Sequence, residues 1–344
     1  MDVKSLAVWA PKYFLNDEIF SPESPFNRDD TLSPYRLLQK TMEEMGWECH
    51  TQDIYQRRNV TPDAVLFINI PKKPISALLG SWSKSVKSYA LLNECEVIVP
   101  QSWKKNKQAQ FSKLFSWHDD LIDDQRVIRI HFPQKLSALT PPISFNQKKL
   151  CTLIAGNKRE RHPLELYSKR IEAIRWFEKN HPSEFDLYGI GWDEYKFYWP
   201  KALRLLNRTK PLLRYLAPYY PSYAGPVMNK REALSKYKFS ICYENAKSIP
   251  GYITEKIFDS FLAGCVPVYL GAPNVSDHIP KDCFIERESF RSYEELYEYM
   301  QGMSENEHAE YVMRINAFLQ SKEAFPYSEQ YFASTIAKTI VCDA

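Results

Sequence analysis

The sequence predicts an α/β protein made of two Rossmann-like domains that face a cleft. Apolar strand patterns alternate with helical patterns in two separate runs, which indicates two parallel sheets with crossover helices. A loop containing Pro133, Pro141 and Pro142 separates the runs and marks the expected domain boundary. The length of 344 residues also favours two domains.

The first run has the alternation of a βαβ arrangement. The expected elements are a strand at 3–9, a helix at 33–45, a strand at 64–70, a strand at 89–92 that continues through 97–100, and a strand at 126–132. Leu38 and Met42 share one face of the helix, as expected for a helix that packs on a sheet.

The second run contains the clearest βαβ unit. The expected strands are 150–154, 185–188, 239–243 and 265–270, and the expected helices are 164–179 and 255–263. Thr254 is a candidate N-cap of the last helix, and Gly264 is its expected stop. Because ligands of open parallel sheets bind beyond the carboxyl ends of the strands, Glu244, Asn245 and Tyr252 are expected at the ligand edge.

The composition narrows the function classes. Lys and Arg number 45 against 42 Asp and Glu, and the net charge of +3 is too small for a dedicated nucleic-acid binder. Only 10 Gly are present and no glycine-rich phosphate loop, so phosphate would be bound by helix termini and cations. The seven Cys and seven His lack ligand spacing, which argues against a disulfide framework and a metal site and favours a reducing compartment.

The start of the helix at 255–263 combines features that suit a phosphate-bearing leaving group. Its free N–H groups attract anions, and Lys256 adds a full positive charge in the first turn. Glu255 beside it is suited to stabilise positive charge that develops on a sugar as its bond to phosphate breaks.

These residues lie in a longer stretch that resembles a known enzyme family. Residues 237–275, YKFSICYENAKSIPGYITEKIFDSFLAGCVPVYLGAPNV, resemble the signature of the α1,3/α1,4-fucosyltransferases of glycosyltransferase family 10. The resemblance continues more weakly through LLNECE at 91–96, FSW at 115–117, LIAGNK at 153–158 and LYGIGW at 187–192. It implies a GT-B fold and an enzyme that transfers L-fucose from GDP-fucose, with inversion, to a hydroxyl of a GlcNAc- or Glc-containing glycan, as in protein or lipopolysaccharide glycosylation.

The resemblance also implies a division of labour along the chain. Residues 1–145 would bind the acceptor, residues 146–327 would bind the GDP-sugar donor, and a helix at 328–344 would pack back on the first domain. The donor-binding residues it implies are Arg170, Asn245, Tyr252, Glu255 and Lys256, and Asn157 and Glu244 are expected as further donor-binding residues. The sequence departs from the family motif around Gly156 and Asn157, so Arg159 and Arg161 stay open as alternatives to Arg170 for the diphosphate.

Inversion by single displacement needs a base that takes the proton of the attacking hydroxyl. The resemblance places Glu94 in this catalytic role, together with Glu255, and Glu96 is the nearest competitor. Burial between Leu92 and Val97 would raise the pKa of the Glu94 carboxyl and strengthen the base.

The segment 196–220 departs from the family pattern. It holds six Lys or Arg and no acid, interleaved with leucines and aromatic residues. One interpretation is a surface that meets anionic lipid or a lipid-linked glycan at a membrane. The other is a helical insert packed on the domain with its charged face in solvent.

The predicted partners are GDP-fucose and an oligosaccharide or lipid-linked glycan acceptor, with no nucleic acid. No cofactor or metal is expected to be required, because no cluster of residues demands one, and stimulation of the enzyme by Mn²⁺ stays open. A cytoplasmic location is expected, with segment 196–220 as the element that would hold the protein to the inner membrane face. The competing interpretations are a transferase that uses another nucleotide sugar and a catalytically silent glycan-binding homologue.

Overall fold

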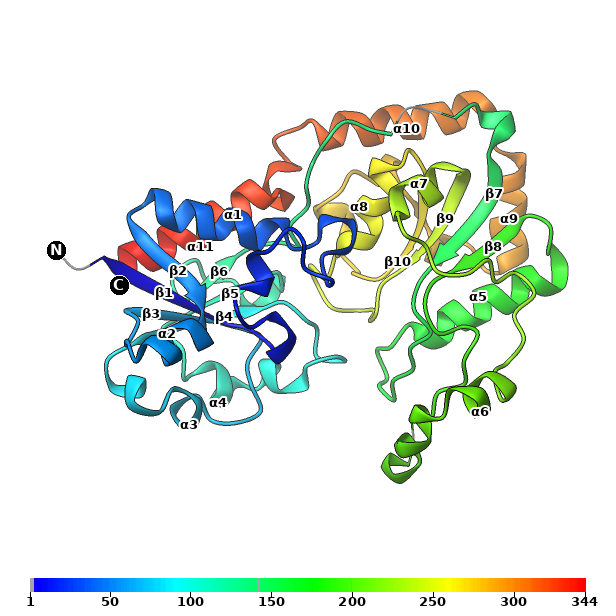
Figure 1. The fold of residues 1–344 in the computed structure, drawn as a ribbon. Helices are drawn as coiled ribbons and strands as arrows, with labels where there is room; N and C mark the ends of the chain where they lie inside the picture. Colours follow the sequence, from blue (N-terminus) through cyan, green and yellow to red (C-terminus); the bar gives the residue numbers. More distant parts are fainter. Residues whose placement is uncertain (1–2, 141–142, 199) are drawn as a thin grey trace. The chain divides into compact units, whose positions relative to one another are not determined.

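The computed structural model describes residues 3–140, 143–198 and 200–344, and the chain divides into two compact units (Figure 1). The first unit comprises Met1–Leu136, Ile249–Glu255 and Ser321–Ala344. The second comprises Ser137–Ser248 and Lys256–Gln320. The chain therefore leaves the second unit for a short stretch at 249–255 and returns to the first unit after residue 320.

The first unit is built on a parallel sheet with the strand order β2-β1-β3-β4-β5-β6. Its strands are β1 Lys4–Trp9, β2 Trp47–Thr51, β3 Ala64–Ile68, β4 Lys87–Leu92, β5 Lys113–Ser116 and β6 Val127–Arg129. The central strands are apolar and buried, as expected for a sheet covered by helices on both faces.

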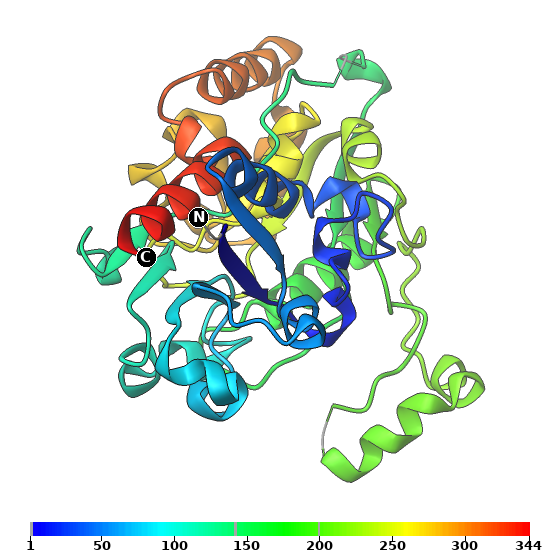
Figure 2. The same cartoon turned by 60° about the vertical axis from the view of Figure 1, so that its left-hand side comes forward.

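The helices of the first unit come from both ends of the chain. They are α1 Ser33–Glu44, α2 Gln52–Arg58, α3 Ile75–Leu79, α4 Lys105–Gln108 and α11 Glu329–Asp343. Helices α1 and α11 lie side by side in both ribbon views (Figures 1 and 2). Leu38 and Met42 of α1 share a core with Phe332, Ile336 and Ile340 of α11, all nearly inaccessible to solvent.

The second unit has its own parallel sheet, in the order β11-β10-β9-β7-β8. Its strands are β7 Lys149–Ile154, β8 Phe185–Tyr188, β9 Tyr237–Tyr243, β10 Val266–Leu270 and β11 Ile285–Glu286. The helices are α5 Tyr167–Asn180, α6 Lys210–Tyr215, α7 Lys230–Ser235, α8 Glu255–Leu262, α9 Tyr293–Gly302 and α10 Glu305–Leu319. The strands and α5 share a core that includes Phe177, Phe185 and Phe239.

Most of the predicted strands and helices are present with ends shifted by a few residues. The α/β class and the two Rossmann-like units are confirmed. Gly264 follows α8 with a φ of +63°, which fits its predicted role as a helix stop. The predicted strand continuation at 97–100 is wrong, because the backbone turns at Cys95, whose carbonyl accepts from the N–H groups of Ile98 and Val99.

Each sheet has one point at which the strand order reverses. In the first unit β1 lies between β2 and β3, and in the second unit β7 lies between β8 and β9. Open parallel sheets bind ligands beyond the carboxyl ends of the two strands at such a point. Within the described residues, no helix combines the length and the apolar character needed to cross a bilayer.

Candidate functional site

The reversal point of the second unit gathers several of the predicted donor-binding residues. Asn157 follows the carboxyl end of β7, and Glu244 and Asn245 follow the carboxyl end of the neighbouring strand β9. Lys256 stands in the first turn of α8, the helix that connects β9 to β10. Polar side chains from two adjacent strand ends and a helix start therefore occupy the edge where a ligand is expected.

Glu244 and Lys256 form the central ion pair of this edge. The side chain of Glu244 is completely buried, and its Oε2 lies 3.1 Å from Nζ of Lys256. The backbone N–H of Glu244 donates to the carbonyl of Leu270 at 2.8 Å, which fixes the residue against β10. A carboxylate removed from water needs a charged partner, so this pair holds the ammonium group in place beside the N-terminus of α8.

Gly271 makes room for the Glu244 carboxylate. A Cβ added at Gly271 would lie 2.6 Å from Cγ of Glu244 and 2.6 Å from the hydroxyl of Tyr269. Any larger residue at this position would push against the buried acid, so the tight packing requires glycine.

Arg170 reaches the same strand end from α5. It is 4% exposed, and its Nη2 donates to the carbonyls of Tyr243 at 2.6 Å and Glu244 at 2.8 Å. Nη2 also lies 3.1 Å from Oδ1 of Asn245. These charge-assisted hydrogen bonds position the loop that carries Glu244 and Asn245. The role of Arg170 as a ligand of the diphosphate stays a prediction.

Asn157 is tied into its own loop. Its Nδ2 donates to the carbonyl of Gly191 at 2.9 Å, and its carbonyl accepts from the hydroxyl of Tyr198 at 2.7 Å. Its Oδ1 is buried and has no hydrogen-bond partner among the described residues. A small, open pocket lies beside it, lined by Asn157, Arg159, Glu194, Tyr195, Lys196, Tyr198 and Pro218. Arg159, one of the open alternatives to Arg170, therefore lies next to Asn157.

Glu94 lies in the first unit, on the loop that follows β4. Oδ1 of Asn69 accepts from the backbone N–H groups of Asn93 at 3.0 Å and Glu94 at 2.9 Å. The indole N–H of Trp103 donates to the carbonyl of Glu94 at 3.1 Å, and that of Trp117 donates to the carbonyl of Asn93 at 3.3 Å. Side chains from three other segments thus fix the backbone of Glu94 on both sides.

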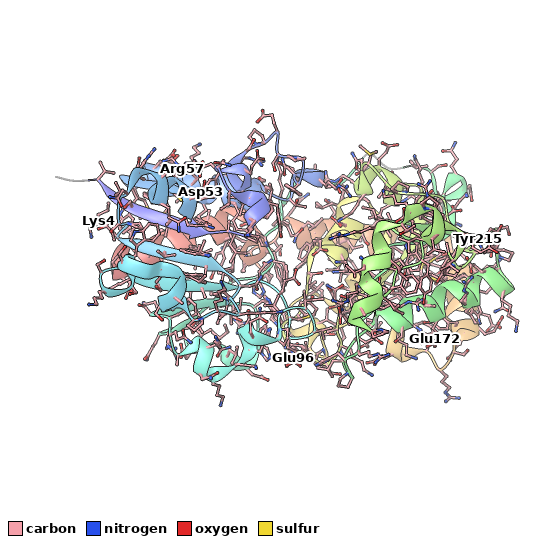
Figure 3. The ribbon with its side chains drawn as sticks, turned by 60° about the horizontal axis from the view of Figure 1, so that its bottom comes forward. Lys4, Asp53, Arg57, Glu96, Glu172 and Tyr215 are labelled. Atoms are coloured by element: carbon pink, nitrogen blue, oxygen red, sulfur yellow. The ribbon has the colours of Figure 1, made fainter. Side chains whose placement is uncertain are left out.

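The sequence pattern did not single out Asn69 or Trp103, and Trp117 entered only as part of the FSW motif at 115–117. Asn69 follows β3 at the reversal point of the first sheet and has a φ of +60°, a left-handed conformation that asparagine tolerates. The signal that points to it is an asparagine directly after a buried strand, at a carboxyl end. Glu96, the alternative to Glu94, lies on the same loop (Figure 3) and is half-buried.

Tyr252 packs within the first unit, next to the loop that carries Glu94. It is 1% exposed, its ring centroid lies 4.7 Å from that of Trp117, and it hydrogen-bonds to the thiol of Cys95. Burial raises the pKa of the Cys95 thiol, and the hydrogen bond from Tyr252 opposes that rise. Tyr252 therefore lies close to the loop that carries Glu94. Glu255, three residues later in the chain, is half-buried and is the first residue of α8.

His118 adds a titratable group to this aromatic cluster. Its imidazole stacks on Trp117 with ring centroids 5.7 Å apart and an interplanar angle of 16°. Burial lowers the pKa of His118, and nearby Asp120 and Asp119 oppose that shift. The lowered pKa favours the neutral form of the imidazole. The sequence analysis did not identify His118 as a site residue.

Comparison with known proteins shows that part of this chain matches a family model. Residues 222–344, which include the β9–α8–β10 unit, match the family model described as glycosyltransferase family 10 (fucosyltransferase), C-terminal part. Over these residues, about a third of the chain, the resemblance noted in the sequence is confirmed.

Curated proteins that match part of this chain are named as fucosyltransferases. An α-(1,3)-fucosyltransferase, FucT, of Helicobacter pylori is 35% identical over 83 residues, which cover 24% of this chain and 17% of the relative. An α-(1,4)-fucosyltransferase of Arabidopsis thaliana is 38% identical over 74 residues, 22% of this chain and 18% of the relative. The matched stretches thus span less than a fifth of these two relatives.

Solved structures resemble the chain over nearly its whole length. The crystal structure of an α1,3-fucosyltransferase with GDP has a TM-score of 0.57 at 16% identity and covers 98% of this chain and 90% of that chain. The crystal structure of an α1,3-fucosyltransferase with GDP-fucose gives a TM-score of 0.55 at the same identity and coverage. At this level of identity the similarity shows a shared fold alone.

Proposed function

We propose that the protein is an inverting fucosyltransferase that transfers L-fucose from GDP-fucose to a hydroxyl of a GlcNAc- or Glc-containing glycan in α1,3 or α1,4 linkage. The observation that carries the proposal is the Glu244–Lys256 pair at the strand-order reversal of the second unit, within the residues that match the family 10 model. The names of the relatives and the GDP-fucose complex of a structural neighbour support the choice of donor.

In the proposed donor site, the diphosphate of GDP-fucose takes the place next to Lys256 and the first turn of α8. As the bond between C1 of fucose and the phosphate oxygen breaks, negative charge grows on the departing GDP. Lys256 and the free N–H groups of the helix start stabilise that charge. Arg170 holds the loop that carries Glu244 in place through its hydrogen bonds to the carbonyls of Tyr243 and Glu244. Glu255 stabilises the positive charge that develops on the sugar ring.

In the proposed acceptor step, the glycan hydroxyl attacks C1 from the face opposite GDP and Glu94 takes its proton. A base must keep a constant position relative to the reacting oxygen. The backbone N–H of Glu94 donates to Asn69, and the indole of Trp103 donates to the carbonyl of Glu94, so these two bonds hold the residue in a constant position. The acceptor would be an oligosaccharide or a lipid-linked glycan, and no metal would be required, because Lys256 and α8 supply the charge.

The test is transfer of labelled fucose from GDP-fucose to a panel of free and lipid-linked glycans. Glu94→Gln is expected to lower kcat by about 10² to 10⁴ and to leave GDP binding unchanged, because only the proton acceptor is lost. Glu96→Gln is the matched control. Normal turnover of Glu94→Gln would remove Glu94 from the mechanism.

The donor site is tested separately by calorimetry with GDP. Lys256→Ala is expected to weaken GDP binding about 10- to 100-fold, because a charge-assisted contact to phosphate is lost. Lys236→Ala, an exposed lysine of the same unit, is the control. Turnover with other GDP- or UDP-sugars but not with GDP-fucose would contradict the proposed donor. Measuring transfer with added EDTA and with added Mn²⁺ tests whether a metal ion contributes to the rate.

A further inference from the structure

An arm of two short helices extends from the second unit. It comprises residues 202–216, within the 3₁₀ helix Lys201–Arg208 and α6 (Figures 1 and 2). The arm exposes large apolar side chains, namely Leu203 at 38%, Leu205 at 67%, Leu206 at 37%, Tyr215 at 87% and Leu216 at 41%. Tyr215 lies at the outer edge of the unit in Figure 3. The arm therefore differs from an insert that packs its apolar face on the domain.

The attachment of the arm explains why its leucines point outward. Asn207 faces the unit, where its Oδ1 accepts from the backbone N–H of Phe197 at 2.9 Å and its Nδ2 donates to the carbonyl of Phe197 at 3.0 Å. In a 3₁₀ helix residues three apart share a face, so Leu203 and Leu206 lie on a different face from Asn207. Leu213, 3% exposed, supplies the apolar anchor. The usual arrangement, with leucines inward and amides outward, is reversed here.

The charge of the arm has one sign. Arg204, Arg208, Lys210 and Arg214 are exposed, and the sequence contains no Asp or Glu between Glu194 and Glu232. Among the described residues, Arg214 is 4.0 Å from Glu194, and no carboxylate lies within ion-pair distance of Arg208 or Lys210. Four like charges on fifteen residues oppose the pairing of this arm with its copy in a second molecule.

We propose that the 202–216 arm docks on a membrane surface that contains anionic lipid. Exposed leucines and a tyrosine interleaved with cations are the composition of segments that lie in the interface plane, with apolar groups in the acyl boundary and cations among the headgroups. A lipid surface accepts both sets of side chains at once, because its apolar interior lies directly below its negative charge. This inference does not depend on the proposed transfer reaction.

The first experiment is co-sedimentation of the full chain with vesicles. Vesicles of phosphatidylcholine with phosphatidylglycerol are expected to bind the protein, and vesicles of phosphatidylcholine alone are expected to bind it far more weakly. Added salt should reduce the binding, since it screens the cations. Equal binding to both vesicle types, or sedimentation through self-association without vesicles, would overturn the proposal.

Variants of the arm separate its two contributions. Arg208→Gln with Lys210→Gln is expected to lower binding to the anionic vesicles about 30-fold, at about 1 kcal/mol for each cation. Leu205→Ser with Tyr215→Ser is expected to lower it about tenfold or more through lost apolar burial. Neither pair touches the predicted donor residues, so GDP binding should stay unchanged and reports on folding.

Matched controls lie outside the arm. Lys179→Gln with Lys236→Gln removes two exposed cations of the same unit, and Met228→Ser removes an apolar side chain that is 94% exposed. Both controls are expected to bind vesicles like the wild type. If they weaken binding as much as the arm variants do, binding reflects overall charge and the assignment to the arm is wrong.

Discussion

At the scale of single residues, Glu94 depends on a neighbour for its position. Asn69 uses one side-chain oxygen to hold two successive N–H groups of the Glu94 loop. Because the proposed base must stay within hydrogen-bond reach of the acceptor hydroxyl, a small movement of this loop costs rate without affecting the donor. In the proposed mechanism, Asn69 would act as a positioning residue.

We expect Asn69→Gly to lower kcat about 10- to 100-fold and to leave the KM for GDP-fucose unchanged. Glycine keeps the left-handed backbone and removes the side chain that carries the acceptor oxygen. Asn69→Asp, which restores an oxygen at that place, should recover most of the rate. Steady-state kinetics with Asn59→Gly, another asparagine of positive φ, provides the control. A fall in kcat of the same size for Asp and Gly would contradict the positioning role.

A second prediction at this scale concerns Gly271. In Gly271→Ala the new methyl group would push against the buried Glu244, so we expect a loss of about 1 to 3 kcal/mol in the free energy of unfolding. Because Glu244 holds Lys256, GDP binding should weaken as well. Gly302→Ala, where a Cβ meets no atom within 4 Å among the described residues, should change neither quantity. Calorimetry with GDP and urea unfolding would measure both.

At the scale of elements, α11 completes the core of the first unit. Ile336 is inaccessible to solvent and lies in the same core as Leu38 and Met42 of α1. We expect Ile336→Ala to lower the free energy of unfolding by about 2 to 5 kcal/mol, and Lys338→Ala, exposed on the same helix, to change it little. Thermal unfolding of the two variants would test this, and equal midpoints would show that α11 adds little to the core.

The elements also show what a sequence can predict. The β9–α8–β10 unit was predictable because its strands, helix stop and polar loop are local patterns. The strand at 97–100 was wrong because an apolar run does not reveal that β4 ends at Leu92 and that the chain turns at Cys95. The strand Trp47–Thr51 was missed because its alternation is short and carries Glu48 and His50.

The candidate site was predictable only in part. Glu244, Asn245 and Lys256 follow from the strand end and the helix start, which are adjacent in sequence. The hold of Asn69 on Glu94 joins residues 25 positions apart, and that of Arg170 on Tyr243 joins residues 73 apart. Such hydrogen bonds leave no periodic pattern, so only the folded chain reveals them.

At the scale of the whole molecule, stability should depend on the protonation of His308. Its Nε2 lies 3.1 Å from the carbonyl of Lys238, and burial lowers the pKa of its imidazole to about 4, with Lys148 and Lys238 adding to the shift. The ordinary value is 6.5. Between pH 6.5 and about 4 the unfolded chain therefore binds a proton that the folded chain does not.

We expect acidification through this range to lower the free energy of unfolding, by up to about 3 kcal/mol from His308 alone, and we expect no contribution above pH 6.5. His308→Gln should remove this part of the pH dependence. Urea unfolding at pH 7 and pH 5, for the wild type and the variant, measures the difference. If the two proteins lose the same stability between these pH values, His308 is not the group responsible.

The path of the chain between the two units has a consequence for synthesis on the ribosome. Residues 1–136 emerge before the second unit, yet their unit also needs residues 249–255, which are translated part-way through the second unit, and α11, which is translated after it. Of these two units, the first is therefore completed last, and part of its apolar surface stays uncovered while the second unit is synthesised. A nonsense codon just before α11 would leave that unit without its last helix, so a late truncation should be as harmful to expression as an early one.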